Sequence, residues 1–281
     1  MTWKKRQYGG FWWSPWSRLG DVSHDDVPGG IGIYRIRSRQ PERLAYVGEG
    51  VLRSRIGHWR RACSIPEEQA SAVSDDRLEF LAFHEERLGG YEVSWTQGPA
   101  DISDKRIRRG HESHLLWLYR REACRSALAN CGRAHSKLNL IGSGKLAYGK
   151  TFFLPSSRPV EPCGHQPHSD RWMGFRWTQL ISRRELKHAS KEDLCGFRLG
   201  WMQHGPALYK ALSPRLKLLK IGYKRHAQGG LLDVFRSLPG GTVAAWANVG
   251  PLIPKYHCLE LCTDLVGAHF HRTGEVPGCQ F

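Results

Sequence analysis

Six short segments of this chain occur twice in the same order, and this internal repeat constrains the fold more than any single motif. Matching segments in a common order indicate two copies of one structural unit, although no one segment is persuasive alone. The paired segments are Phe11–Ser14 with Phe175–Thr178, Gly32–Arg35 with Pro206–Lys210, Ala45–Gly48 with Leu219–Gly222, Gly90–Trp95 with Gly241–Trp246, His111–Ser113 with Leu259–Leu261, and Ala127–Asn130 with Pro277–Gln280.

The run PGGIGIYRIRSRQPERLAYVGEGVLRSRIGHW, residues 28–59, predicts a β-hairpin followed by a helix. Gly30–Ile36 and Leu44–Val47 are rich in β-branched and aromatic residues, and the polar residues between them are typical of a turn. Antiparallel pairing would bring Tyr34 and Tyr46 close together. Cross-strand packing alone explains most such tyrosine pairs, so a catalytic role for these two tyrosines depends on the other residues of the pattern.

Gly32-Ile33-Tyr34 and Tyr46-Val47-Gly48 resemble the two tripeptides of the GIY-YIG nuclease family. In that family the tripeptides lie on neighbouring strands, a following helix carries an arginine, and a glutamate on a later helix holds one divalent metal ion. The resemblance implies an α+β fold with two tandem GIY-YIG-like domains, each a small, mainly antiparallel sheet flanked by helices. We expect Gly32 and Gly48 to let a phosphate backbone approach the sheet.

The helical run after Gly48 offers the arginine that the resemblance requires. Arg55 is the best match, and Arg53 competes with it. The family usually places a histidine four residues beyond its arginine, whereas here His58 lies three beyond Arg55 and Trp59 occupies the expected place. The resemblance implies a catalytic role for His58, and the altered spacing leaves that role open.

Glu112 and Asn130 match the remaining family positions. The apolar residues after Glu112 predict a helix, and we expect Glu112 in its first turn, where the helix dipole favours a carboxylate. The resemblance implies that Glu112 holds Mg²⁺ or Mn²⁺, and a single carboxylate suffices because magnesium keeps much of its water. Asn130 would hydrogen-bond near the site.

The resemblance also implies a mechanism. Tyr34 would be the general base and Tyr46 would order the water or the phosphate, while Arg55 would hold the nonbridging oxygens. A metal ion at Glu112 would neutralise the leaving 3′ oxygen, so the products would carry 5′-phosphate and 3′-hydroxyl ends. A free phenol has a pKa of about 10, so Tyr34 needs nearby cations to act near neutral pH.

The chain has 281 residues and a formal net charge of +16, which indicates an anionic polymer as its partner. We expect DNA, and RNA also fits this charge. No apolar stretch approaches the roughly 18 residues that span a bilayer, and the N-terminus lacks a secretory apolar region, so we expect no membrane partner and a cytoplasmic location. The candidate phosphate-binding residues are Arg53, Arg60, Arg61, Lys105, Arg106, Lys217, Lys220, Lys224 and Arg225.

The expected domains are residues 1–154, a proline-rich linker at 155–174, and a degenerate second copy at 175–281. In the second copy Lys220 replaces the second tyrosine, and Arg225 is the only plausible substitute for Arg55. Tyr209 and Glu260 remain as counterparts of Tyr34 and Glu112, and we expect structural roles for both.

Cysteines predict neither a disulfide scaffold nor a strong metal site. The eight cysteines are scattered and form no CxxC pair. Cys163, His165 and His168 lie close together in the proline-rich segment but lack a clear fourth ligand, so an ordinary linker is favoured over a zinc site.

We therefore expect a metal-dependent DNA endonuclease, with a restriction or defence role preferred over repair or a mobile element. One chain with one centre would nick duplex DNA, and a double-strand cut would need a homodimer. The alternative is a catalytically silent nucleic-acid-binding or assembly protein that keeps the GIY-YIG fold.

Overall fold

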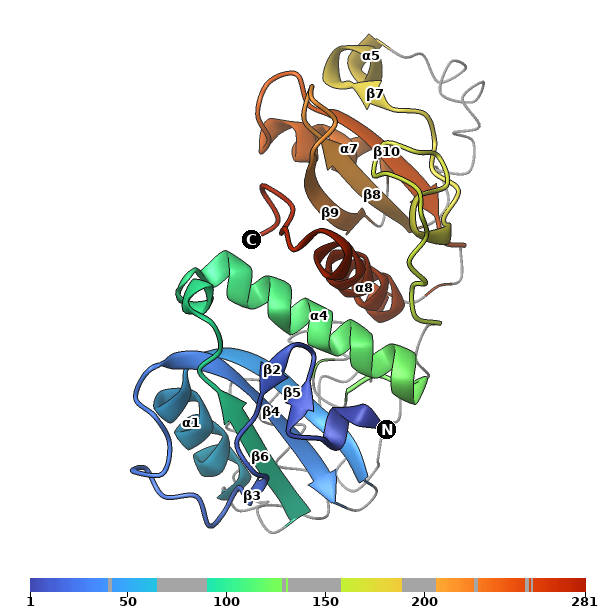
Figure 1. Ribbon diagram of the computed structural model, residues 1–281. Coiled ribbons are helices and arrows are strands. Elements are labelled where there is room, and N and C mark those ends of the chain that lie inside the picture. The colour runs from blue at the N-terminus through green and yellow to red at the C-terminus, as the bar shows by residue number, and fades with distance from the viewer. Residues whose placement is uncertain are drawn as a thin grey trace, which may run out of the picture. The chain divides into compact units, whose positions relative to one another are not determined.

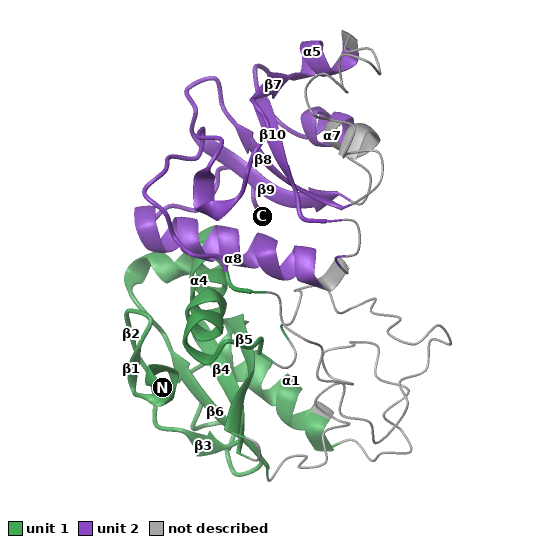
Figure 2. Ribbon diagram, turned by 90° about the vertical axis from the view of Figure 1, so that its right-hand side faces the viewer, with its two compact units in different colours: residues 1–159 green, residues 160–281 purple. Residues whose placement is uncertain are grey.

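The computed structural model describes residues 1–39, 42–64, 90–127, 130, 158–188, 206–224, 227–250, 253 and 255–281. Contacts divide the chain into two compact units, Met1–Pro159 and Val160–Phe281, which Figure 2 colours separately. Each unit contains a four-stranded antiparallel sheet with helices. The α+β class expected from the sequence is confirmed.

The sheet of the first unit has the strand order β3-β6-β4-β5, so β5 lies at an edge (Figure 1). A short hairpin, β1 with β2, precedes it. The elements are η1 (Thr2–Lys4), β1 (Gln7–Tyr8), β2 (Phe11–Trp12), β3 (Ser17–Arg18), β4 (Ile31–Arg39), β5 (Glu42–Val51), α1 (Leu52–Ser64), β6 (Tyr91–Thr96), η3 (Ala100–Ser103) and α4 (Lys105–Ala123).

The hairpin expected at residues 28–59 is present, and both of its strands are longer than the apolar runs that predicted them. β4 and β5 pair antiparallel with Tyr34 opposite Gly48 and Ile36 opposite Tyr46, and the register shifts between Ile36 and Arg37. The tyrosines are therefore diagonal neighbours on one face of the sheet. This register brings both rings over the edge strand beside Gly48.

The two faces of this sheet are covered by different helices, as Figures 1 and 2 show. Successive residues of a strand point to opposite faces, so Tyr34 and Ile36 pack with α1 while Ile33 packs with α4 and the N-terminal hairpin. The α1 side chains in this core recur at helical spacing. They are Leu52, Ile56, Trp59 and Cys63.

Helix α4 begins earlier than its apolar residues suggested. Asp104 caps it, since its carboxylate accepts a hydrogen bond of 2.6 Å from the backbone N–H of Arg106. Glu112 is consequently the eighth helical residue, about two turns from the N-terminus. The expectation that Glu112 lies in the first turn is wrong, and the helix dipole does not explain a carboxylate there.

The sheet of the second unit has the order β7-β10-β8-β9, with β9 at an edge. Helix α7 packs on one face of it, and α8 contacts β8 and β9. The elements are η5 (Trp172–Gly174), β7 (Ile181–Ser182), α5 (Arg183–His188), β8 (Ala207–Leu212), β9 (Leu218–Lys224), α7 (Ala227–Arg236), β10 (Val243–Asn248) and α8 (Lys255–Thr273).

Most of the described part of the segment expected as a linker, residues 160–174, belongs to the second unit. The backbone N–H of Val160 donates to Asp264 at 3.0 Å, and Arg272 donates to the carbonyl oxygens of residues 163–165. Trp172 and Met173 are buried. These residues therefore contribute to the core of the second unit.

Several details of local structure recur in the two units. The indole of Trp13 donates to the carbonyl oxygen of Tyr8 at 3.0 Å, and the indole of Trp177 donates to that of Trp172 at 2.8 Å. A register shift between Ala211 and Leu212 repeats the one in the first hairpin. These matches, with the common strand order, indicate that the paired sequence segments build equivalent elements.

A buried cation occupies the same strand position in both units. Arg35 lies 4.3 Å from the Trp13 ring and donates hydrogen bonds to backbone carbonyls of the N-terminal segment. Lys210 lies 4.5 Å from the Trp177 ring and donates to the carbonyl oxygen of Ser169 at 2.6 Å. The aromatic ring and carbonyl oxygens offset the cost of burying each charge.

Candidate active site

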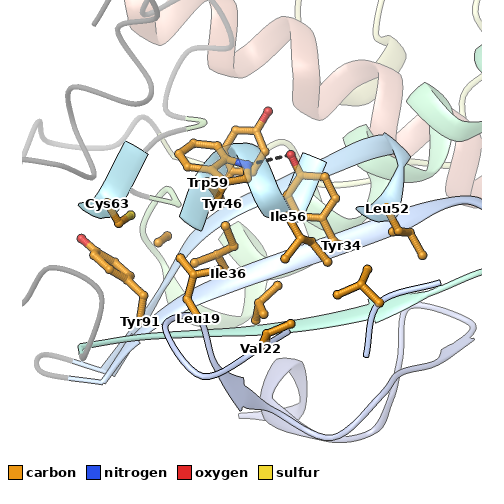
Figure 3. Close-up of a cluster of buried hydrophobic side chains, with 13 residues drawn as sticks. Leu19, Val22, Tyr34, Ile36, Tyr46, Leu52, Ile56, Trp59, Cys63 and Tyr91 are labelled. Atoms are coloured by element: carbon orange, nitrogen blue, oxygen red, sulfur yellow. Dashed lines mark hydrogen bonds between the residues drawn. The ribbon is translucent and has the colours of Figure 1, made fainter. Parts of the chain in front are cut away.

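Two buried tyrosines and one tryptophan form the centre of the candidate site. The Tyr34 and Tyr46 rings, 2% and 5% exposed, have centroids 5.8 Å apart. The Trp59 ring from α1 lies 4.6 Å from the Tyr46 ring, and its Nε1 donates a hydrogen bond of 2.7 Å to the Tyr34 hydroxyl oxygen (Figure 3). The three side chains thus hold one another in place.

The glycines of the two tripeptides have a packing role that differs from the expected one. A Cβ atom at Gly48 would lie 2.6 Å from the Tyr34 hydroxyl oxygen and would also collide with the Tyr46 ring. At Gly32 it would lie 2.7 Å from Leu52 Cδ1 and collide with a backbone carbonyl. Glycine is required at both places because neighbouring protein atoms fill the space that a side chain would take.

The described contacts favour Arg55 over Arg53 as the arginine of the site. Arg53 donates a hydrogen bond of 2.9 Å to the carbonyl oxygen of Val27, which ties it to the preceding loop. Arg55 is exposed, and its Nε lies 3.0 Å from the place that a Cβ at Gly50 would take. Its charge also acts on the Tyr34 phenol. Arg55 therefore lies beside the edge of the sheet, next to the tyrosines.

Trp59 is a residue of the candidate site to which the family pattern gives no role. It lies on the buried face of α1, whereas His58 is half-buried on the neighbouring face. The spacing of Leu52, Ile56 and Trp59 is the signal that could have identified it, because residues four and seven positions beyond a core residue share its helix face. Trp59 supplies a hydrogen bond to the Tyr34 hydroxyl oxygen.

Glu112 reaches the same region from α4. It is 8% exposed, and its charge acts on the Tyr34 phenol together with that of Arg55. One turn earlier, Arg108 donates to Glu49 at 2.7 Å and to the carbonyl oxygens of η3. This buried pair fixes α4 against β5, and so it positions Glu112 beside the edge strand that carries Gly48.

Burial raises the pKa of the Tyr34 hydroxyl well above its ordinary value of about 10, and the neighbouring Tyr46 adds to the rise. The hydrogen bond from Trp59 and the charge of Arg55 oppose this change, while the charge of Glu112 reinforces it. Tyr34 is therefore a neutral phenol in the free protein. Additional positive charge is needed before it can act as a base.

Asn130 binds the backbone of β5 beside the tyrosine pair. Its side-chain oxygen accepts from the N–H of Val47 at 2.7 Å, and its nitrogen donates to the carbonyl oxygen of Val47 at 3.0 Å. The expected hydrogen bond near the site is thus made to the strand between Tyr46 and Gly48. Asn130 positions that strand and does not contact the Tyr34 hydroxyl through these bonds.

The expected phosphate-binding residues differ in exposure. Arg60 is exposed and donates to the carbonyl oxygen of Val22 at 2.8 Å. Lys220 lies opposite Ala211, as Tyr46 lies opposite Ile36, so it does take the place of the second tyrosine. Arg61, Lys105, Arg106 and Lys217 are exposed, Arg53, Lys220 and Lys224 are partly exposed, and Arg225 lies outside the described residues.

The second unit has a different residue at the position of the candidate metal ligand. Helices α4 and α8 each have 19 residues, and each carries a hydroxyl side chain at its ninth position that bonds the carbonyl four residues earlier. This common register places Cys262, and not Glu260, at the position of Glu112. The expected pairing of Glu260 with Glu112 is therefore wrong, because helix position decides the match.

Tyr209 keeps the environment of Tyr34 in part. A Cβ at Gly222 would lie 2.5 Å from Tyr209 Cζ, which repeats the contact between Gly48 and Tyr34. Burial, with a smaller contribution from Cys262, raises the pKa of Tyr209 to about 12. Helix α7 contains neither a tryptophan nor an arginine before its final residue, Arg236. The second unit thus keeps the tyrosine and the glycine, while α7 has no counterpart of Trp59 and the α8 position of Glu112 is Cys262.

No group of three or more His, Cys, Asp or Glu side chains in the described ranges is arranged to hold a metal ion. Cys163, His165 and His168 do not form such a group, and Cys163 instead accepts a hydrogen bond from the backbone N–H of Met173. The cysteines that the structure describes are free, namely Cys63, Cys124, Cys163, Cys258, Cys262 and Cys279.

Comparison of the chain with models of protein families, with curated proteins and with solved structures finds no match. Among the described residues, none of the helices is both long enough and apolar enough to cross a membrane.

Proposed function

We propose that the first unit is a metal-dependent endonuclease that hydrolyses DNA phosphodiester bonds. The observation that carries this proposal is the arrangement around Tyr34, where an aromatic partner, an indole donor, a cation and a carboxylate act on one buried hydroxyl. Simple cross-strand packing does not require the charges of Arg55 and Glu112. Titratable groups with strongly perturbed pKa values are typical of catalytic sites.

Glu112 is the residue proposed to hold Mg²⁺ or Mn²⁺. A carboxylate oxygen suits these hard cations, and a single protein ligand fits an ion that retains several waters. Arg108 engages Glu49, so that second carboxylate is already neutralised by an ion pair of 2.7 Å. When bound, the ion would supply Lewis-acid stabilisation of the leaving 3′ oxygen.

Tyr34 is proposed as the general base, and because the phenol is buried it needs nearby positive charge to ionise. The phenol is protonated in the free protein, so it becomes competent only as positive charge accumulates in the site. The exposed Arg55 guanidinium contributes such charge and can bind two nonbridging oxygens at once. Tyr46, packed against both Tyr34 and Trp59, would order the attacking water or the phosphate.

The second unit is proposed to contribute DNA contacts without a cutting centre. Lys220 and Cys262 stand at the positions of Tyr46 and Glu112, so these two positions carry neither a phenol nor a carboxylate. Lys217, Lys220 and Lys224 lie along β9 and its preceding turn, where they provide positive charge for phosphate. A restriction or defence setting is the one we propose for this nuclease.

The proposal is tested by incubating the purified protein with Mg²⁺ or Mn²⁺ and supercoiled plasmid, single-stranded DNA or RNA. We expect nicking of plasmid, and we expect Tyr34→Phe and Glu112→Gln each to reduce single-turnover cleavage by at least about 100-fold with little loss of binding. Glu122→Gln is the matched control on α4, because Glu122 binds the backbone N–H of Trp3 at 3.2 Å, away from the site. Wild-type cleavage without added metal would contradict the role of Glu112.

The second candidate is a nucleic-acid-binding protein that keeps the fold and does not cut. It is favoured by one observation, the deep burial of Tyr34 with its raised pKa. The same substrates separate the two functions, since a silent protein would shift DNA in a binding assay and leave every substrate intact at any metal concentration.

A further inference from the structure

Trp59 makes a directional contact with Tyr34 through its indole nitrogen. Its Nε1 lies 2.7 Å from the Tyr34 hydroxyl oxygen, within the range of a good hydrogen bond (Figure 3). An indole N–H can only donate, so the phenol oxygen must be the acceptor. The proton of Tyr34 is consequently left for an acceptor other than Trp59.

Packing holds the indole in this orientation. Trp59 is 3% exposed and lies between Tyr46 and the α1 residues of the same core cluster. Ile56 precedes it on the buried face, and Cys63 follows it. Because close-packed side chains rarely change rotamer without cost, the direction of the hydrogen bond to Tyr34 is set by the fold.

We propose that Trp59 is a positioning residue that directs the proton of Tyr34 away from α1 and favours the phenolate form of Tyr34. This inference rests on the proposed nuclease function. A hydrogen bond to a charged acceptor is stronger than one to a neutral acceptor, so the indole N–H stabilises the phenolate more than the phenol. Trp59 thereby offsets part of the cost that burial imposes on ionised Tyr34.

The donor-only chemistry of indole also excludes one proton route. An imidazole at this position would be able to accept the Tyr34 proton, whereas Trp59 cannot. The proton of Tyr34 must therefore pass to water or to a group other than the Trp59 indole. The site thus differs from one in which a histidine on the helix takes the proton from the tyrosine.

The second unit gives an internal comparison. Tyr209 occupies the place of Tyr34, but the sequence of α7, AQGGLLDVFR, contains no tryptophan. The unit that lacks the indole donor also lacks the carboxylate at the position of Glu112. The indole therefore accompanies the other proposed catalytic groups and is not a general feature of this fold in the chain.

The test is the pH dependence of single-turnover cleavage by wild type, Trp59→Phe and Trp59→His. Trp59→Phe keeps an aromatic ring and removes the hydrogen-bond donor. The rising limb of the plot of cleavage rate against pH should therefore move to higher pH. Cleavage at pH 7 should fall about tenfold, and the rates of variant and wild type should converge at high pH. Trp59→His restores a ring N–H and should move the limb back, but an imidazole can also accept a proton, so Trp59→Phe is the variant that decides the role of the donor. Ile56→Val, one turn away on the same face, should lower thermal stability without moving the limb.

Other outcomes separate the two proposals. A wild-type protein that cuts none of the substrates overturns the nuclease function and this inference with it. An active wild type whose pH profile matches that of Trp59→Phe, or a variant slowed equally at every pH, overturns the role of Trp59 alone.

If Trp59→Phe does not fold, the indole N–H resonance of Trp59 is compared in wild type and Tyr34→Phe by NMR. Loss of the acceptor should shift this resonance upfield. An unchanged resonance would show that the indole does not donate to Tyr34, and it would overturn the inference.

Discussion

Asn130 and Gln280 make the same pair of hydrogen bonds in their own units. Asn130 binds the backbone N–H and carbonyl of Val47 at 2.7 and 3.0 Å, and Gln280 binds those of Ile221 at 2.7 and 3.0 Å. Each amide accepts and donates as a neighbouring strand would, and so each covers part of an edge strand. In the first unit Asn130, which matches the last position of the family motif, thus binds the edge strand that carries Gly48.

Arg55 and Arg53 provide a matched pair on one helix. Arg55→Ala should reduce single-turnover cleavage by about 100-fold, since it removes the charge proposed to bind nonbridging oxygens. Arg53→Ala should leave the chemical step within about threefold of wild type, because Arg53 bonds the carbonyl oxygen of Val27. Cleavage rates at saturating protein check both. Equal losses in the two variants would contradict the assignment of Arg55.

The second unit is expected to tolerate changes at its counterparts of the catalytic groups. Tyr209→Phe combined with Cys262→Ser should leave cleavage within about threefold of wild type, because neither residue has the partners needed for catalysis. Plasmid nicking by the double variant is the measurement, with circular dichroism to confirm folding. Complete loss of nicking in a folded double variant would make the second unit catalytic.

The lysines of the second unit are expected to control salt dependence. Replacing Lys217, Lys220 and Lys224 with glutamine should weaken DNA binding and reduce the slope of log K against log salt by about one for each residue that contacts phosphate. Binding is measured from low to moderate salt, with Arg236→Gln as a single-charge control from α7. An unchanged slope in the triple variant would place the DNA elsewhere.

Lys210 is expected to make the stability of the second unit depend on pH. Burial lowers the pKa of Lys210 from 10.5 to about 7, although Asp170 and Cys163 partly oppose this. Between these values the unfolded chain binds the proton and the folded unit does not, so stability should rise with pH from about 7 to 10.5. Below pH 7 both states are protonated, and the penalty is fully present.

Lys210→Met isolates this contribution. The variant removes the titrating group and keeps an apolar chain over the Trp177 ring, so its melting temperature should exceed that of wild type most clearly near pH 7. The difference between variant and wild type should then shrink as the pH approaches 10. Thermal unfolding of the whole chain across this range checks the prediction, and a difference that is constant with pH would contradict it.

Local patterns in the sequence were enough to predict the hairpin. Two runs of β-branched and aromatic residues separated by a polar turn predict a hairpin, and the observed pairing of β4 with β5 agrees with that prediction. The expected α+β class followed from the resemblance of the two tripeptides to a known family. The nuclease function expected from the tripeptides stays a prediction.

Helix boundaries and register depended on residues outside the apolar runs. Asp104 starts α4 well before the residues that predicted the helix, so Glu112 lies in its interior. Aligning short sequence segments paired Glu112 with Glu260, whereas counting along the two helices pairs it with Cys262. A helix begins where its first amides find a cap, and a short apolar pattern does not contain that information.

The sequence by itself determined the tyrosine-bearing hairpin through local residue patterns, the order of the repeated segments through self-similarity, and the α+β class through the resemblance of its motifs. Only the tertiary structure decided that Trp59 donates to Tyr34, that Gly48 is required by the tyrosine rings, and that Arg55 rather than Arg53 lies beside them. These relationships join residues of different elements across the sheet. They depend on the direction of each side chain after packing, which the spacing of residues along one element does not specify.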